Sequence, residues 1–240
     1  MQKILIIAEA GHNHMGYMRH AKLLIEEAKS CGADIVKFQA YNADKIKKPW
    51  ESRYFELKLS EHTFEEFKEI KEYCDKIDIE FMASAFDLER LQWLREIKVK
   101  RFKIDSRSVN DIELLRDIAE KREATQEVIA SIPYGDYSKA TALQKYLPYS
   151  KRLYCIPEYP APSGGFKFDS SFFPQRYDGI SDHTIGLEVA MIALTKGANI
   201  IEKHFTLDKG LPGPDQICSI TTDELAQLVS FARKLEEITK

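Results

Sequence analysis

Eight short apolar runs rich in Ile, Val and Phe recur along the chain, and helix-like stretches separate most of them. This alternation limits the possible folds more than any other feature, because it is typical of parallel β-strands joined by crossover helices. The runs end near Ala10, Tyr41, Phe86, Ser106, Ile132, Pro157, His183 and Phe205. Eight parallel strands can close into a barrel, so we predict an α/β fold, a single-domain (β/α)8 or TIM barrel over residues 1–240.

Helix signals between the runs support this arrangement. Residues 18–33 and 187–199 repeat apolar residues at helical spacing and finish in a glycine-containing turn, which predicts a glycine C-cap for each helix. Residues 60–78 begin with a serine that we expect to cap a solvated surface helix. Residues 221–240 begin with a threonine in the same role.

Two segments, residues 42–58 and 159–176, fit the alternation less well, and we expect both to be long loops at the carboxyl end of the barrel. That end carries the chemistry in such barrels, because each strand delivers its last side chains there. The strand ends are unusually polar and hold Glu9, Lys37, Gln39, Ser84, Lys103, Ser106, Ser131, Tyr159, Ser181, Asp182, His183, Glu202 and His204. A buried ring of acids, lysines and histidines is costly to hold without a function.

Composition excludes several kinds of partner. The chain has 35 basic and 38 acidic residues and a net charge of -3, so no overall field favours nucleic acid or a membrane surface. The N-terminal apolar run is too short for a signal peptide or a membrane span, which predicts a cytoplasmic protein. The 4 cysteines are widely scattered, and we interpret them as reduced.

Lysines at the strand ends indicate an anionic ligand. Lys37 and Lys103 lie two predicted strands apart, close enough to reach one anionic group. Ser106 and Ser131 can donate hydrogen bonds to its oxygen atoms. A phosphate or a carboxylate is the ligand that this set favours.

Histidines at the last two strand ends indicate a metal. His183 and His204 end adjacent predicted strands, and a divalent first-row ion accepts neutral imidazole while carboxylate or water completes its shell. Glu9 and Glu202 can contribute directly or through water. Strand alternation favours Glu202 as an inward-facing partner, whereas Asp182 adjoins His183 and is expected to support the neighbouring backbone.

Longer stretches of the sequence resemble one enzyme family. Residues 8–16, 33–41, 102–106 and 179–215 together are similar to the sialic acid synthase family, the phosphoenolpyruvate-dependent N-acetylneuraminate synthases and their relatives. The resemblance runs from about residue 4 to residue 224. It implies a barrel enzyme that condenses phosphoenolpyruvate with the open-chain aldehyde of an amino sugar and releases phosphate. Such a transferase would serve nonulosonic acid and surface polysaccharide biosynthesis, and the family resemblance also suggests a homodimer.

The resemblance implies residue roles as well. His183 and His204 would hold a divalent metal that polarises the aldehyde oxygen, manganese first, with magnesium or cobalt as alternatives. Together with Glu9 and Glu202 they are the expected catalytic residues. Asp215 and Glu9 would contact the sugar. The expected substrate-binding residues are Lys37, Gln39, Ser84, Lys103, Ser106, Ser131, Tyr159, Ser181 and Asp215.

The sequence also departs from the family pattern. Ser108 stands where a functional glutamate is expected, and Pro157 stands where an asparagine is expected. The sequence ends where the family continues into an antifreeze-like domain that supplies an arginine to the partner's sugar site. We therefore expect either a fragment or an acceptor other than N-acetylmannosamine. Two alternatives stay open: a barrel aldolase or lyase acting on a phosphorylated or carboxylated substrate, and a non-catalytic subunit that binds phosphoenolpyruvate and metal.

Overall fold

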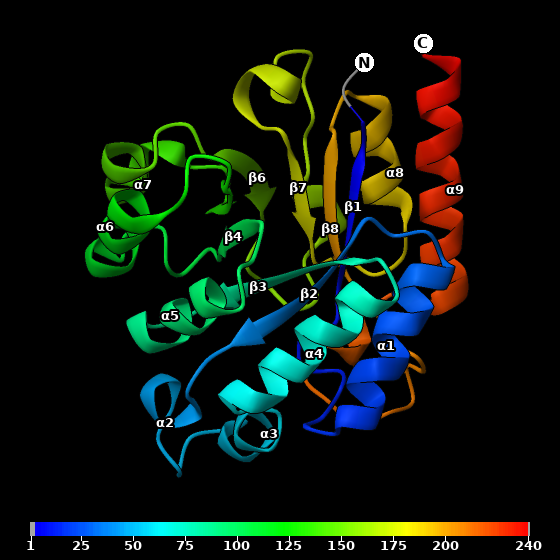
Figure 1. Ribbon diagram of the computed structural model, residues 1–240. Helices are drawn as coiled ribbons and strands as arrows, with labels where there is room; N and C mark the ends of the chain where they lie inside the picture. The colour runs from blue at the N-terminus through cyan, green and yellow to red at the C-terminus, as the bar shows by residue number, and fades with distance from the viewer. Residues whose placement is uncertain (1–2, 240) are drawn as a thin grey trace.

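The computed structural model describes residues 3–239, and it has a closed barrel of parallel strands that follow one another in sequence order (Figure 1). The last strand closes the barrel by pairing with the first, with Glu9 opposite His204. The predicted (β/α)8 barrel is therefore confirmed. The strands are β1 (Leu5–Glu9), β2 (Ile35–Ala40), β3 (Glu80–Ala85), β4 (Arg101–Ile104), β5 (Glu127–Pro133), β6 (Lys151–Cys155), β7 (Gly179–Asp182) and β8 (Ile200–His204).

Helices surround the barrel, and two of them end at the glycines that the sequence predicts as C-caps. Gly32 and Gly197 follow two of them with φ angles of 81° and 101°, a left-handed conformation that glycine adopts without a steric penalty. The α-helices are α1 (Met18–Ser30), α2 (Ala43–Ile46), α3 (Tyr54–Leu59), α4 (Phe64–Lys76), α5 (Leu88–Glu96), α6 (Ile112–Lys121), α7 (Thr141–Tyr146), α8 (Glu188–Thr195) and α9 (Thr222–Ile238).

The N-caps differ in one place from expectation. Thr221 caps α9 in a capping box with Glu224, as the sequence predicts. For α4 the expected serine cap, Ser60, is wrong, and Thr63 takes that role. Glu66 lies three residues after Thr63 and accepts a hydrogen bond from the Thr63 backbone N–H at 2.7 Å, so a reciprocal capping box forms there.

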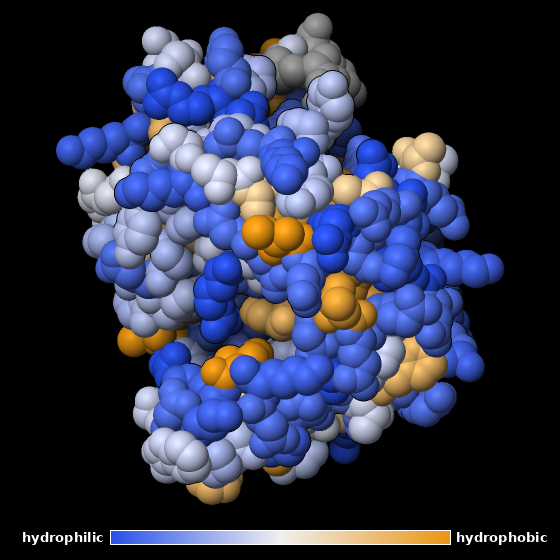
Figure 2. Space-filling model, turned by 90° about the vertical axis from the view of Figure 1, so that its left-hand side faces the viewer, coloured by the Kyte–Doolittle hydropathy of each residue, from blue (hydrophilic) through white to orange (hydrophobic). Residues whose placement is uncertain are grey.

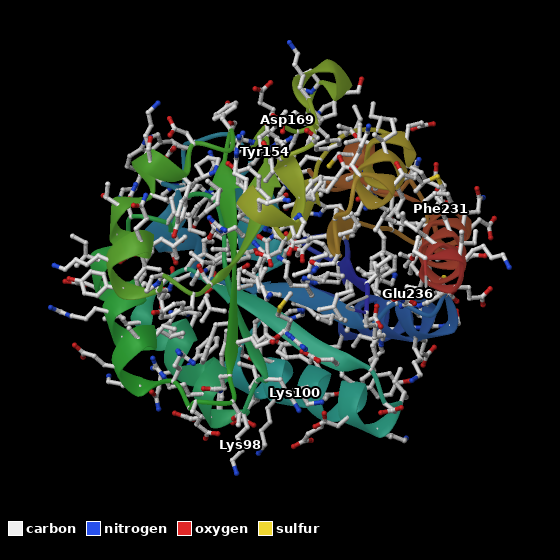
Figure 3. All side chains as sticks on the ribbon, turned by 90° about the horizontal axis from the view of Figure 1, so that it is seen from above. Lys98, Lys100, Tyr154, Asp169, Phe231 and Glu236 are labelled. Carbon is white, nitrogen blue, oxygen red and sulfur yellow. The ribbon has the colours of Figure 1, made fainter. Side chains whose placement is uncertain are left out.

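The crossover from β6 to β7 corrects a second expectation. Only the first residues of segment 159–176 lie at the carboxyl end, where the backbone N–H of Ala161 donates to the carbonyl oxygen of His183 at 2.9 Å. The rest runs back outside the barrel, and Tyr154 on β6 and Asp169 lie at the same edge of the molecule (Figure 3). Its aromatic side chains provide the reason, because Phe172 packs with its ring centroid 5.2 Å from that of Tyr154. The segment thus buries apolar surface where other crossovers use a helix.

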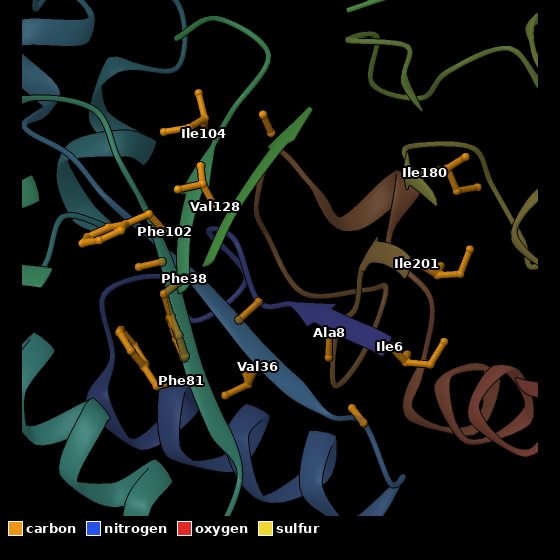
Figure 4. Packing of buried hydrophobic residues seen from close by; sticks show 14 of the residues in the cluster. Ile6, Ala8, Val36, Phe38, Phe81, Phe102, Ile104, Val128, Ile180 and Ile201 are labelled. Atoms are coloured by element: carbon orange, nitrogen blue, oxygen red, sulfur yellow. The ribbon is translucent and has the colours of Figure 1, made fainter. Parts of the chain in front are cut away.

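Strand alternation creates distinct layers inside and outside the barrel. Side chains that face outward pack beneath the helices, as Figure 4 shows for Ile6, Val36, Phe81 and Phe102. The inward-facing apolar layer consists of Ile7, Ile35, Met82, Ile129, Leu153 and Ile200. Two residues further along each strand, the period of two brings the next inward layer to the carboxyl end. This second layer is polar, and it forms the floor of the candidate site.

The molecular surface is that of a hydrophilic protein on the face shown in Figure 2, where apolar residues are scattered. Across the described residues, no helix combines the length and the apolar character that crossing a membrane requires.

Candidate active site

One side chain from each strand forms a buried ring at the carboxyl end of the barrel. The ring lies directly above the apolar layer, because six of its members follow a residue of that layer by two positions along the strand. Lys103 and Ser181 follow Arg101 and Gly179 in the same way. Its eight members, taken from β1 to β8, are Glu9, Lys37, Ser84, Lys103, Ser131, Cys155, Ser181 and Glu202. Each ring side chain therefore owes its place to strand register rather than to a local loop.

Ion pairs connect the two lysines of the ring to its two acids. Lys37 Nζ lies 2.7 Å from Glu9 Oε2 and 3.8 Å from Glu202 Oε2. Lys103 Nζ lies 3.6 Å from Glu202 Oε1 and donates a hydrogen bond to Ser131 Oγ at 2.7 Å. Ser181 Oγ donates to Glu202 Oε1 at 2.8 Å. The ring thus balances two cations against two carboxylates in a buried space.

The pKa values of the two acids shift in opposite directions. Burial raises the pKa of Glu9, although Lys37 lowers that pKa in part. Burial would also raise the pKa of Glu202, but Lys103 and Lys37 outweigh it and hold this pKa below its ordinary value. Burial alone would lower the pKa of Lys37, yet the carboxylates of Glu202 and Glu9 raise it. Glu202 is therefore the permanent anion of the ring, whereas Glu9 is the carboxyl group more easily protonated.

The two predicted histidines face one another above the ring. The ring centroids of His183 and His204 lie 5.6 Å apart. Burial lowers the pKa of each to about 4, so both imidazoles are neutral at pH 7. His183 Nδ1 donates to the carbonyl oxygen of Ile156 at 2.8 Å, which fixes its tautomer and leaves Nε2 with a lone pair. His204 Nδ1 is buried without a hydrogen-bond partner among the described residues.

This histidine pair fits a divalent metal ion. Neutral imidazole nitrogen is a good ligand for first-row divalent ions, and an unpartnered buried nitrogen loses hydrogen-bond energy unless something occupies it. No group of three or more His, Cys, Asp and Glu side chains within residues 3–239 is arranged to hold a metal. His183 and His204 would therefore leave coordination positions for water and substrate, as an open catalytic site requires.

Asp215 joins two loops beside the histidines. His12 Nδ1 donates to Asp215 Oδ2 at 2.9 Å, and His204 Nδ1 lies 3.7 Å from the same oxygen. Burial would raise the pKa of Asp215, but His204 and His12 outweigh it and lower this pKa strongly. In the first loop, the backbone N–H of Gly16 donates to His14 Nδ1 at 3.0 Å, so His14 shapes the turn. The loop after β8 is thereby held against the loop after β1.

The ring opens into a larger adjoining cavity of about 290 Å³. Both spaces are lined by the same five residues, which makes them continuous: Gln39, Ser106, Arg107, Tyr159 and His204. Asp215 lines the outer cavity, so the predicted catalytic and substrate-binding residues all lie on these two connected surfaces. The strand-end residue that lies elsewhere is Asp182, because it faces outward. Its carboxylate lies 3.0 Å from Lys203 Nζ and accepts from the Thr184 backbone N–H at 2.8 Å.

Several lining residues escape prediction from sequence. Asp105 lies two residues after Lys103, so strand alternation alone predicts that its side chain faces the same way as that of Lys103. Arg107, Lys47 and Arg53 line the outer cavity from loops, where no periodicity indicates which way a side chain faces. Ser108 does not line either cavity.

A larger hollow of about 580 Å³ lies at the opposite end of the barrel, among residues that precede β3, β4 and β5 or begin those strands. Its basic side chains are partly neutralised, since Arg101 pairs with Glu127 at 2.6 Å and also with Glu80. None of the polar ring lines it. Chemistry at the carboxyl end is favoured because the buried titratable groups converge there.

Known proteins similar to this chain include synthases of legionaminic and neuraminic acids. The model of the NeuB family matches residues 24–240. The N,N'-diacetyllegionaminic acid synthase of Legionella pneumophila is 35% identical over 97% of this chain and 72% of its own length. The N-acetylneuraminate-9-phosphate synthase of Mus musculus is 33% identical over 96% of this chain and 70% of its own length.

Structural similarity agrees with the sequence matches. The crystal structure of N-acetylneuraminic acid (sialic acid) synthetase from Leptospira borgpetersenii in complex with citrate has a TM-score of 0.89 to this chain. It is 33% identical, and the match covers 99% of this chain and 85% of that one.

Proposed function

The chain belongs to the NeuB family and is an enzyme of the carbon–carbon bond-forming transferase type, and on this premise we propose that it condenses phosphoenolpyruvate with the open-chain aldehyde of a sugar. The products are a 3-deoxy-2-ulosonic acid of the nonulosonic type and inorganic phosphate. The observation that carries the proposal is one continuous cavity that holds two buried lysines, hydroxyl donors and a neutral histidine pair. An anion and a carbonyl group can therefore be bound side by side.

The lysine side of the ring suits phosphoenolpyruvate. Lys37 and Lys103 supply charge, and Ser84, Ser106, Ser131 and Ser181 supply hydroxyl donors around the same space. Charge-assisted hydrogen bonds are strong in such a buried site, because little water competes for the ligand oxygens. Glu9 forms an ion pair with Lys37 in the free protein. When an anionic ligand displaces Glu9 from Lys37, the raised pKa of Glu9 favours protonation of its carboxylate.

The histidine side suits the aldehyde of the sugar. His183 and His204 would hold the divalent metal, manganese first, and that ion when bound would act as a Lewis acid toward the aldehyde oxygen. The carbonyl oxygen of Ile156 holds the His183 ring in the required tautomer. Tyr159 packs its ring 4.2 Å from that of His183 and lines the path of the sugar, and Asp215 and Gln39 offer hydrogen-bonding groups for its hydroxyls.

The proposed reaction forms one carbon–carbon bond and breaks the bond between C2 and the phosphate oxygen of phosphoenolpyruvate. C3 of phosphoenolpyruvate forms a bond to the aldehyde carbon, and the aldehyde oxygen takes up a proton and becomes a hydroxyl. The C2 atom is then cationic, and Glu202 supplies a fixed negative charge beside it. Water adds to C2 and loses a proton. The bond between C2 and the phosphate oxygen then breaks while the hydroxyl proton at C2 passes to the departing phosphate, which leaves the ketone and inorganic phosphate.

Phosphate release tests the proposal directly. The protein is incubated with phosphoenolpyruvate, a panel of aldoses and hexosamines, and Mn²⁺, Mg²⁺ or Co²⁺ in turn. We expect phosphate release only when phosphoenolpyruvate and an aldehyde are both present, with a new 2-ulosonic acid in equal amount. Cleavage of a single substrate would instead indicate an aldolase or lyase. Binding of phosphoenolpyruvate and metal without consumption, across the whole panel, would contradict the proposal.

A further inference from the structure

We propose that the acceptor sugar carries a phosphate group at the end remote from its aldehyde, and that Lys47, Arg53 and Arg107 bind this phosphate. The inference deepens the proposed function and rests on it, because it names the class of sugar that occupies the outer cavity.

The outer cavity is strongly cationic at its mouth. Three permanently basic side chains line it: Lys47 follows α2, Arg53 precedes α3, and Arg107 follows β4. The one carboxylate on its wall is Asp215, which is already engaged by His12 Nδ1 at 2.9 Å. The chain as a whole has a net charge of -3, so this local excess of positive charge is not a general property of the surface.

Two of these cations lack the ion pairs that neighbouring cations have. Lys58 pairs with Asp44 at 2.9 Å, and Lys45 pairs with Asp87 at 3.2 Å. Among the described residues, Lys47 and Arg53 have no acidic side chain within 4.0 Å. Unpaired cations that converge on a concave surface are positioned for an anionic ligand.

Arg107 is the third cation, and its surroundings favour a ligand over an internal partner. Its Nε lies 3.8 Å from Asp105 Oδ1, at the outer limit of an ion pair, and its side chain is 67% exposed. Its guanidinium lies over the ring of Phe86, 5.2 Å from the centroid, which limits its orientation without using its hydrogen-bond donors. Arg53 is also constrained, because its backbone has a φ of 67° in the left-handed region.

The order of groups along the cavity determines which end of the sugar is charged. Ser106 and His204 lie where the outer cavity meets the ring, so the reacting aldehyde belongs at that inner boundary. Lys47 and Arg53 line the outer cavity but not the ring, and Arg53 is exposed, which places an anion at the solvent side with Arg107 between it and the ring. Two guanidinium groups and an ammonium match a phosphate better than a carboxylate, because a phosphate monoester carries nearly two negative charges and three acceptor oxygens, whereas a carboxylate carries one charge and two oxygens.

Turnover on matched sugars tests this preference. Phosphate release from phosphoenolpyruvate is measured with hexosamines and hexoses, with their 6-phosphates, and with hexuronates as the carboxylate arm. We expect kcat/KM to be about 10- to 100-fold higher for the 6-phosphate than for the free sugar, as charge-assisted hydrogen bonds predict. Arg53→Gln and Lys47→Met should remove most of that advantage while changing turnover of the free sugar little, because neither residue lines the ring. Preference for the free sugar or the uronate would overturn the proposal and leave the proposed function intact.

Matched controls separate the phosphate site from general loss of positive charge. Lys48→Met is the control for Lys47→Met, because Lys48 is the next residue but does not line the cavity. Arg116→Gln is the control for the arginine variants, because Arg116 lies exposed on α6 outside the site. Both controls should keep the parent preference. Equal losses in the controls would also overturn the assignment.

Binding of an unreactive sugar phosphate tests the phosphate site even in the absence of turnover. A hexitol 6-phosphate has no aldehyde and cannot react, so its binding is measured by calorimetry with and without saturating phosphoenolpyruvate. We expect binding that persists with phosphoenolpyruvate and weakens about 10-fold or more in Arg107→Gln. Binding abolished by phosphoenolpyruvate would place the phosphate in the lysine ring instead, and absence of binding would also overturn the proposal. Hexitol phosphate binding without any turnover would support this site while counting against the proposed reaction.

Discussion

Lys103 offers the clearest test of the anion subsite at the scale of single residues. Its ammonium donates to Ser131 and lies 3.6 Å from Glu202, whereas Lys37 lies directly against Glu9 at 2.7 Å. Lys103→Met should therefore weaken phosphoenolpyruvate binding by about 1.5–3 kcal/mol, the range for hydrogen bonds to a charged group. Titration calorimetry measures the change. Unchanged affinity in a folded variant would exclude Lys103 from the subsite.

The control and the companion variant sharpen that result. Lys100→Met removes an exposed lysine from the other end of the same strand region and should bind phosphoenolpyruvate like the parent. Lys37→Met should weaken binding as well, but it also leaves Glu9 without its buried partner, so a loss of stability is expected alongside.

His183 and His204 carry the metal prediction. His204→Ala and His183→Ala should each abolish stoichiometric Mn²⁺ binding, because one imidazole with water holds such an ion weakly. The barrel should stay folded, since both residues lie at strand ends above the apolar layer. Metal analysis and calorimetry on apo protein measure the loss, and His20→Ala on α1 is the control. Parental Mn²⁺ binding by both site variants would mean that the metal site lies elsewhere.

At the scale of elements, strand register explains what the sequence can predict. The runs of Ile, Val and Phe indicate the strands, and the period of two then places Glu9, Lys37 and Glu202 at one level. The same rule does not reach Lys47 and Arg53, because they lie in a loop whose path depends on tertiary contacts. The β6–β7 crossover was harder still, since aromatic packing replaces a helix there and leaves no helical periodicity.

Close contact between two strands leads to a stability prediction for β7. A Cβ added to Gly179 would lie 1.8 Å from the carbonyl oxygen of Ile200 on β8, and a paired backbone cannot move aside cheaply. Gly179→Ala should therefore destabilise the protein by about 3 kcal/mol or more, the upper part of the range for overpacking. Urea denaturation measures the loss. Gly164→Ala is the matched control, because nothing lies within 4 Å of its added Cβ, and similar stability in both variants would contradict this view of the strand contact.

At the scale of the whole molecule, a buried histidine pair joins the β1 loop to the segment before α4. The rings of His14 and His62 stack with centroids 4.3 Å apart, and both side chains are buried. Glu66 lies 3.5 Å from His62 Nδ1 and raises the pKa of His62, but by less than burial lowers it. Burial lowers the pKa of His14 well below its ordinary value, and burial also lowers the pKa of His62. Both imidazoles are therefore neutral in the folded protein.

This pair makes folding stability depend on pH in one direction. An imidazole in the unfolded chain titrates near pH 6.5, so below that pH the unfolded state binds more protons and the folded state loses stability. Between pH 7.5 and pH 5.5 we expect this pair to contribute a loss of about 1–3 kcal/mol, since each such group costs at most about 1.4 kcal/mol per pH unit. His183 and His204, whose pKa values burial also lowers, add a loss of the same sign. The decline should level off once the pH passes below the folded pKa values. Urea denaturation in the presence of a chelator measures this loss without metal binding. His62→Leu removes one of these four groups and should make the decline shallower by about 1 kcal/mol over this range, whatever its stability at pH 7.5. A parental decline in that variant would show that the protons enter elsewhere.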